Sequence, residues 1–130
     1  MTKDGRAAAL AAEAMKDRGY LYPEWKFVAE HDPDFMASYN AYYRDALSRE
    51  EGLPIKYREL VALGVLAFRG VGEGAMVNHI KRALQHGATR AEIIGALEAA
   101  AIPGGAPTFL HGVRALIKAE EGGATRAQSA

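Results

Sequence analysis

The chain has 130 residues and no cysteine, and its 16 basic side chains balance its 16 acidic ones. The absence of cysteine excludes disulfides, thiolate metal ligands and thiol redox chemistry. The balanced charge removes the main electrostatic argument for binding nucleic acid or an anionic membrane. No apolar run approaches the roughly 18 residues that cross a bilayer, and the N-terminal residues lack a secretory pattern. We therefore expect a cytoplasmic protein.

The length is that of one domain, which we place at residues 1–121, followed by a disordered tail at residues 122–130. Alanine is abundant and β-branched residues are sparse, which favours helix, and no stretch predicts a strand. The predicted helices, in chain order, cover residues 4–18, 24–30, 33–51, 54–69, 73–86, 90–101 and 107–120. Short connections between them indicate an antiparallel array of six to seven helices.

Capping signals set several of these boundaries. Asp32 followed by Pro33 is typical of a helix start, because aspartate caps the first turn and proline fits the first helical position. Thr89 and Glu92 form the pattern of a capping box. Pro103 predicts the end of the helix that Thr89 opens.

Apolar side chains surround the whole circumference of the predicted helix at residues 55–68: Leu60, Val61, Leu63, Val65, Leu66 and Phe68. A helix that is apolar on all sides is normally buried on all sides. A domain of this size has little material with which to cover such a helix alone. We therefore expect a partner subunit to complete the burial, and the protein to form a homo-oligomer.

One acidic residue, Glu59, shares a face of this helix with Ile55 and Leu63. A carboxylate among apolar side chains costs free energy unless it is paired or hydrogen-bonded. Glu59 is therefore a candidate general acid or base, or the anchor of one. Alternatively, it is a structural partner for Arg58, for Lys56 or for an arginine of another helix, or a first-turn acid favoured by the helix dipole.

His79 lies between Met76, Ile80 and Ala83, on the packed side of the predicted helix at 73–86. It is a candidate proton donor or acceptor near neutral pH. Alternatively, it is a core histidine hydrogen-bonded to a backbone carbonyl. The four histidines of the chain lack the spacing of metal ligands, so we expect no metal site.

Three further features are candidates for substrate binding. Trp25 belongs to an aromatic cluster before the main helices, which forms either a cap on the core or a substrate wall. Gly104 and Gly105 present backbone N–H groups to an anion at the start of the last helix, or they form a tight turn. His111 falls off the apolar line of its helix, so it is either exposed or faces a site across a subunit boundary.

Four segments taken together resemble the carboxymuconolactone decarboxylase family. They are Tyr-Arg-Glu-Leu-Val-Ala-Leu at 57–63, Asn-His-Ile-Lys-Arg-Ala-Leu at 78–84, the run from His86 to Ile94, and Ile-Pro-Gly-Gly-Ala-Pro at 102–107. The resemblance covers roughly residues 54–118 and places the family's acid at Glu59 and its histidine at His79. It implies the all-α, AhpD-like fold, assembled as trimers or hexamers with sites near subunit contacts.

The AhpD-like peroxidase branch of this family has cysteines seven and four positions before the histidine. Gly72 and Ala75 occupy those positions here, which excludes thiol peroxidase activity. The resemblance to the branch without cysteine implies a cofactor-independent decarboxylase for a small carboxylated unsaturated lactone, or a related ring acid of aromatic catabolism. Three features depart from the family. Only Glu73 remains of the acids before the histidine, Ala101-Ile102 replaces an aromatic residue, and His111 occupies a stretch that is usually small and apolar.

The resemblance implies a mechanism in which His79 delivers a proton and Glu59 orients His79. Backbone N–H groups of Gly104 and Gly105, or an arginine, would hold an anionic group of the substrate. Two alternatives remain open. The same pair of residues would also serve another cofactor-free lyase or isomerase. The protein would otherwise be a non-catalytic oligomer that binds a small apolar acid or a partner.

Overall fold

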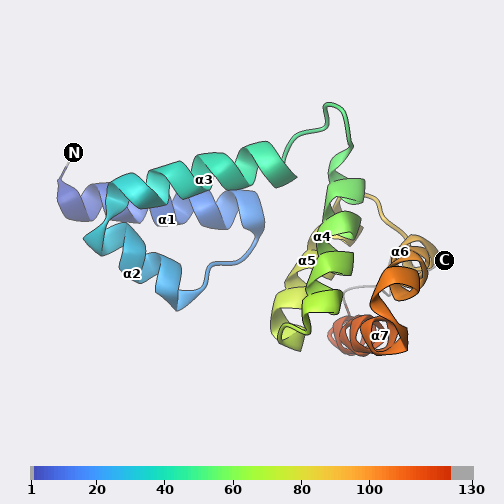
Figure 1. The fold of residues 1–130 in the computed structure, drawn as a ribbon. Helices are drawn as coiled ribbons and strands as arrows, with labels where there is room; N and C mark the ends of the chain where they lie inside the picture. Colours follow the sequence, from blue (N-terminus) through green and yellow to red (C-terminus); the bar gives the residue numbers. More distant parts are fainter. Residues whose placement is uncertain (1, 124–130) are drawn as a thin grey trace. The chain divides into compact units, whose positions relative to one another are not determined.

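The structure is a computed structural model that describes residues 2–123. Within them the chain forms seven α-helices and no strand, which confirms the all-α prediction. The helices belong to two compact units, Met1–Glu50 and Glu51–Ala130, each with an apolar core of its own (Figure 1). The single domain at 1–121 stays a prediction, and most of the predicted tail, residues 124–130, lies outside the described residues.

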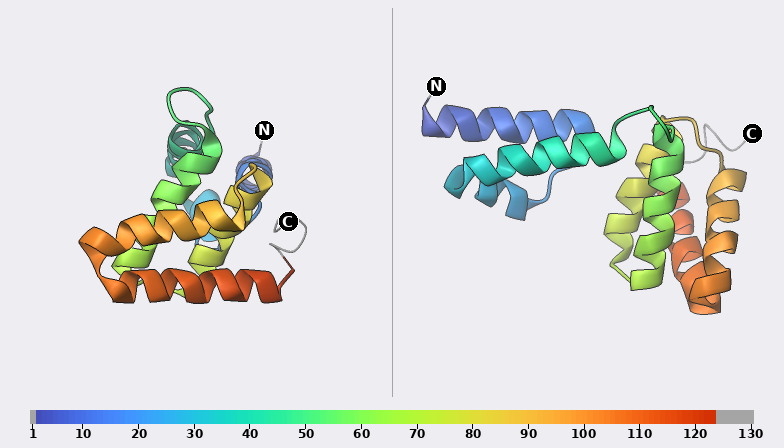
Figure 2. Two further views of the ribbon diagram at one scale, coloured as in Figure 1. Left: turned by 90° about the vertical axis from the view of Figure 1, so that its right-hand side faces the viewer. Right: turned by 45° about the horizontal axis from the view of Figure 1, so that its top comes forward.

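The first unit contains three helices: α1 (Lys3–Arg18), α2 (Pro23–His31) and α3 (Pro33–Leu47). Helices α1 and α3 run in the same direction and α2 runs against them (Figure 2). Asp32 both ends α2 and caps α3, since its carboxylate accepts the N–H of Phe35 at 3.2 Å. The core contains small and flexible side chains: Ala7, Leu10, Ala14, Ala29 and Met36.

Helix α3 ends at Leu47, about one turn before the end predicted at residue 51. The intervening residues, Ser48 to Glu51, carry no apolar side chain that would be buried by a further turn. The guanidinium of Arg49 instead donates to the carbonyl of Asp45 at 2.9 Å, which satisfies a carbonyl at the end of the helix.

The second unit contains four helices: α4 (Ile55–Arg69), α5 (Glu73–Gln85), α6 (Arg90–Gly104) and α7 (Ala106–Glu121). Helices α4 and α5 pack against each other, and α6 lies beside α7 (Figure 2). Fully buried side chains from all four helices form the core, among them Leu63, Ile80, Leu97 and Ala115. No helix in the described part of the chain is long and apolar enough to cross a membrane.

Helix α6 begins as predicted but ends later. Thr89 and Glu92 form both hydrogen bonds of the capping box. The carboxylate of Glu92 also pairs with the ammonium of Lys56 at 3.0 Å, which lowers the pKa of Glu92, raises that of Lys56 and ties α6 to α4.

The predicted stop at Pro103 is wrong, because the helix continues through this proline to Gly104. A proline in the last turn costs the helix one hydrogen bond but has a helical φ. The chain leaves the helix at Gly105, whose φ of 86° is accessible to glycine at little cost.

Candidate active site

The cluster of Glu59, His79 and Arg82 lies inside the second unit. The carboxylate of Glu59 is fully buried. Its Oε2 accepts a hydrogen bond from Nδ1 of His79 at 2.6 Å, and its Oε1 accepts one from Nε of Arg82 at 2.9 Å. Both oxygens of one buried carboxylate are therefore bound by the side chains of a single neighbouring helix.

The placement of the cluster follows from helical spacing. Glu59 shares the buried face of α4 with Ile55 and Leu63, and this face packs against α5. On α5, His79 and Arg82 are three residues apart, so they lie on the same side of the helix. The chain reverses between the two helices at Gly70, whose left-handed φ of 68° ends α4.

Charge pairing makes this burial possible. An isolated carboxylate in a protein interior would cost several kcal/mol in lost hydration. Here the guanidinium of Arg82, itself buried, balances the charge of Glu59, and both carboxylate oxygens are hydrogen-bonded. The His79 side chain keeps 14% of its exposure, against 3% for that of Arg82. His79 is thus the member of the cluster that a molecule from solvent can reach most readily.

Sequence reasoning singled out Glu59 and His79, and the structure brings them into direct contact. It also shows that Glu59 pairs with an arginine of another helix, which was one of the structural alternatives. Arg82 was not named as that arginine. Two facts about the sequence could have identified Arg82. It lies three residues after His79, on the same side of the helix, and a buried carboxylate needs a cation.

Of the two alternatives for Gly104 and Gly105, an anion site and a tight turn, the hydrogen bonds of these residues are closer to the second. The N–H of Gly105 donates to the carbonyl of Ala101 at 2.7 Å, so this donor caps α6 rather than pointing to a ligand. The carbonyl of Gly104 accepts the hydroxyl of Thr108 at 2.9 Å. A Cβ at Gly104 would overlap that hydroxyl, so this glycine permits the close approach of α6 to α7.

The remaining two candidates have structural partners. His111 is partly buried, and its Nε2 donates to the carbonyl of Val71 at 2.6 Å, which ties α7 to the turn between α4 and α5. Trp25 belongs to the first unit, where its ring stacks on that of Tyr39 with 4.0 Å between the centroids. Trp25 therefore belongs to a different unit from Glu59 and His79, whereas His111 belongs to the same unit but makes its hydrogen bond to Val71.

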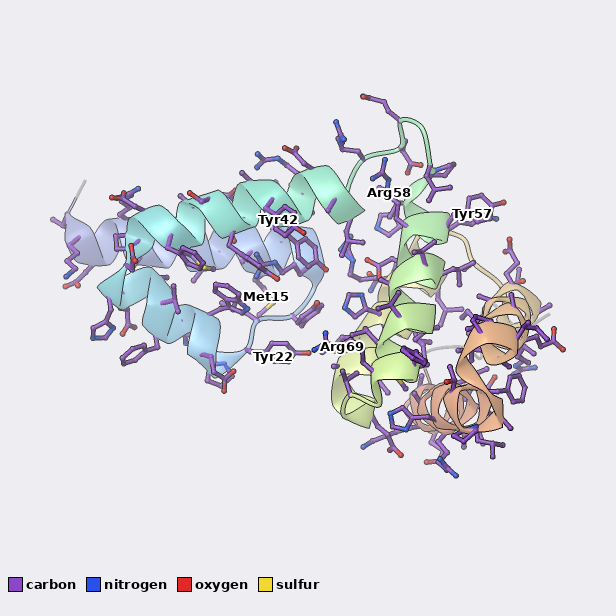
Figure 3. All side chains as sticks on the ribbon, viewed as in Figure 1. Met15, Tyr22, Tyr42, Tyr57, Arg58 and Arg69 are labelled. Atoms are coloured by element: carbon purple, nitrogen blue, oxygen red, sulfur yellow. The ribbon has the colours of Figure 1, made fainter. Side chains whose placement is uncertain are left out.

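An apolar groove of about 540 Å³ runs between α4 and α6. Its lining contains no residue of the Glu59–His79–Arg82 cluster and is almost wholly apolar: Tyr57, Leu60, Val61, Gly64, Val65, Phe68, Ala96, Ala99, Ala100, Pro103 and Gly104. Tyr57, one of these lining residues, extends from the first turn of α4 (Figure 3). The groove and the cluster therefore occupy different faces of α4. Among the described residues, no group of three or more histidines and carboxylates could hold a metal ion.

Comparison with known proteins identifies the family. The sequence model of the carboxymuconolactone decarboxylase family matches residues 33–118. A crystal structure of a provisionally named carboxymuconolactone decarboxylase from Burkholderia xenovorans LB400 is similar with a TM-score of 0.75 and 25% sequence identity. The similarity covers 96% of this chain and 98% of that one. No curated protein matches the sequence. The match over most of the chain shows that it belongs to the carboxymuconolactone decarboxylase family.

Proposed function

We propose that the protein is a cofactor-independent decarboxylase that acts on a small carboxylated unsaturated lactone or a related ring acid. The observation that carries the proposal is the fully buried carboxylate of Glu59, bound on one oxygen by His79 and on the other by Arg82. Membership of the family supports the reaction class. Fold alone would not, because one fold serves many reactions.

The reaction needs little from the protein beyond orientation and a proton. In a lactone whose carboxylate is attached to the saturated carbon next to the ring double bond, with that double bond conjugated to the ring carbonyl, the carbon–carboxylate bond breaks and CO2 leaves. The electron pair of that bond moves into the ring as a dienolate. A proton then adds to ring carbon, so one substrate anion and one proton give CO2 and the neutral lactone.

In this proposal His79 supplies the proton. Its Nδ1–H donates to Glu59, which fixes the orientation of the ring and makes Nε2 the atom that exchanges a proton with the substrate. The carboxylate of Glu59 stabilises the imidazolium before transfer, and Arg82 holds that carboxylate in place. After transfer, the neutral imidazole takes a proton from water.

The test uses substitutions that separate the proton carrier from the structural hydrogen bond. His79→Asn retains an N–H that can donate to Glu59 but has no group that can deliver a proton to the substrate. We expect this variant to lose activity by about 10²-fold or more, as for a general acid, with little change in melting temperature. His86→Gln, an exposed histidine at the end of the same helix, is the matched control and should keep full activity.

The assay follows the loss of the lactone's ultraviolet absorbance together with CO2 release. Turnover without CO2 would replace decarboxylation by isomerisation or hydration on the same pair of residues. Full activity of His79→Asn would remove the proposed role of His79. Binding of the ring acid without turnover would leave a non-catalytic binding protein.

A further inference from the structure

A second buried charge lies in the first unit, outside the Glu59 cluster. Arg18, the last residue of α1, is only 4% exposed, although a guanidinium is always charged in proteins. Its Nη2 donates to Oδ1 of Asn40 at 2.8 Å, and the amide of Asn40 donates to the carbonyl of Leu10 at 3.1 Å. The Nε of Arg18 is buried and has no hydrogen-bond partner among the described residues.

No carboxylate of the described chain pairs with this guanidinium. Two other arginines of the same unit do have carboxylate partners, although they are exposed. Arg6 pairs with Asp34 at 2.8 Å, and Arg44 pairs with Glu13 at 3.4 Å. Arg18 is more deeply buried than either of them and has only a neutral amide as an acceptor. Burying a charge and a donor without a counter-charge is costly, so the site as it stands is incomplete.

Aromatic rings surround the guanidinium. The central carbon of Arg18 lies 4.5 Å from the ring centroid of Tyr43, 5.0 Å from that of Tyr39 and 5.8 Å from that of Trp25. These distances are typical of cation–π interactions, which partly offset the free-energy cost of burying the charge. They do not provide an acceptor for the Nε–H.

Further aromatic side chains flank this aromatic cluster of Trp25, Tyr39 and Tyr43. Tyr42 (Figure 3) lies edge-on to Tyr39, Phe35 stacks on Trp25, and both side chains are more than half exposed. Flat apolar surface therefore extends from the buried guanidinium towards solvent.

We propose that Arg18 and the aromatic cluster form a binding site for a small planar carboxylate, such as an aromatic acid. A carboxylate supplies the two things that the site lacks, a negative charge and an acceptor for Nε, and arginine binds it with two parallel hydrogen bonds. A planar ring matches the flat side chains around it, which favours a small ring acid over an acidic side chain of another protein. The site goes beyond the proposed reaction, and its occupation does not require turnover.

The single tryptophan of the chain reports on this site directly. Because Arg18 is almost inaccessible, a ligand reaches it only when a ring of the cluster moves, and Trp25 is one of those rings. Benzoate, titrated into the full-length protein, should therefore cause a saturable change in tryptophan fluorescence. Benzamide, which has the same shape without the charge, should bind about tenfold more weakly or worse, since its hydrogen bonds to arginine are not charge-assisted.

Substitutions locate the binding. Arg18→Gln should weaken benzoate binding by about tenfold or more, whereas Arg44→Gln, which removes an exposed arginine of the same unit, should leave it unchanged. If Arg18→Gln does not fold, Arg18→Lys takes its place. This variant keeps the charge but loses the Nε–H, so it should also weaken benzoate binding.

Three results would overturn the proposal. They are the absence of a saturable change in the wild-type protein, equal affinities for benzoate and benzamide, and unchanged binding in both Arg18 variants. His79→Asn separates this site from the proposed catalytic one, because it should abolish turnover and leave benzoate binding intact. Loss of benzoate binding in His79→Asn alone would place the ligand at the Glu59 cluster instead.

Discussion

At the scale of single residues, the fully buried carboxylate of Glu59 would cost several kcal/mol if it had no partner. Its cost is met by two partners on one helix, Arg82 and His79. The sequence showed that Glu59 would need partners, because its neighbours on α4 are apolar. It did not identify Arg82, since the register between α4 and α5 decides which of several basic residues reaches the carboxylate.

The pairing predicts strongly non-additive substitutions. Arg82→Met leaves a buried carboxylate without its counter-charge and should lower the free energy of unfolding by about 3–5 kcal/mol. Glu59→Gln leaves the buried guanidinium of Arg82 without its counter-charge, so it should lower the free energy of unfolding by a similar amount. The double variant has neither charge, so it should cost clearly less than the sum of the two single changes.

Urea unfolding of the four proteins, followed by circular dichroism, measures this coupling. If the change in the free energy of unfolding of the double variant equals the sum of the two single changes, the two charges do not depend on each other. The hydrogen bond between His79 and residue 59 changes in both proteins that carry Glu59→Gln, so this change cancels when the four free energies of unfolding are compared.

At the scale of helices, local signals predicted where most of them begin, and packing decided where two of them end. The starts at Pro33 and Arg90 depend on caps within a few residues, Asp32 and Thr89, so they could be identified without the fold. The end of α6 could not, because its last turn tolerates Pro103 while it packs against α7.

The contact between α6 and α7 depends on Gly112. A Cβ at this position would overlap the side chain of Leu97, coming within 2.8 Å of its Cδ1. Gly112→Ala should therefore force the two helices apart and lower the free energy of unfolding by about 1–3 kcal/mol. Gly95 is the matched control, since it lies inside α6 and nothing lies within 4 Å of an added Cβ.

Gly95→Ala should stabilise the protein by about 0.4–1 kcal/mol, because alanine restricts the unfolded chain and favours helix. Thermal and urea unfolding of both variants will show whether the free energy of unfolding falls for Gly112→Ala and rises for Gly95→Ala. Destabilisation by both changes to the same extent would mean that helix propensity, and not the contact with Leu97, governs these positions.

At the scale of the whole molecule, α4 is apolar on all sides, but the described residues do not cover it on all sides. Val61, Val65 and Phe68 are each more than half exposed, and they border the apolar groove between α4 and α6. Such a continuous apolar surface is typical of a subunit interface. We propose that a second copy of the chain covers it, in agreement with the homo-oligomer expected from the sequence.

Light scattering coupled to size exclusion tests the proposal. The wild-type protein should have the mass of an oligomer, and Val65→Asp should shift it towards the monomer by placing a charge in the groove. Gln85→Glu adds a charge at an exposed position of α5 and should leave the mass unchanged. A wild-type protein that is monomeric at micromolar concentration would contradict the assembly.

The amino-acid sequence was enough to predict the helical class, most helix starts, the resemblance to the family and the two residues, Glu59 and His79, whose burial needed explanation. These properties depend on composition and on spacing within one helix, which are local. The packing of the helices was needed to show that Arg82 completes the cluster, that the N–H of Gly105 is used as a helix cap, and that Arg18 is buried without a carboxylate partner among the described residues. Each of these depends on which helix faces which, and with what register, and a pattern along one helix does not contain that information.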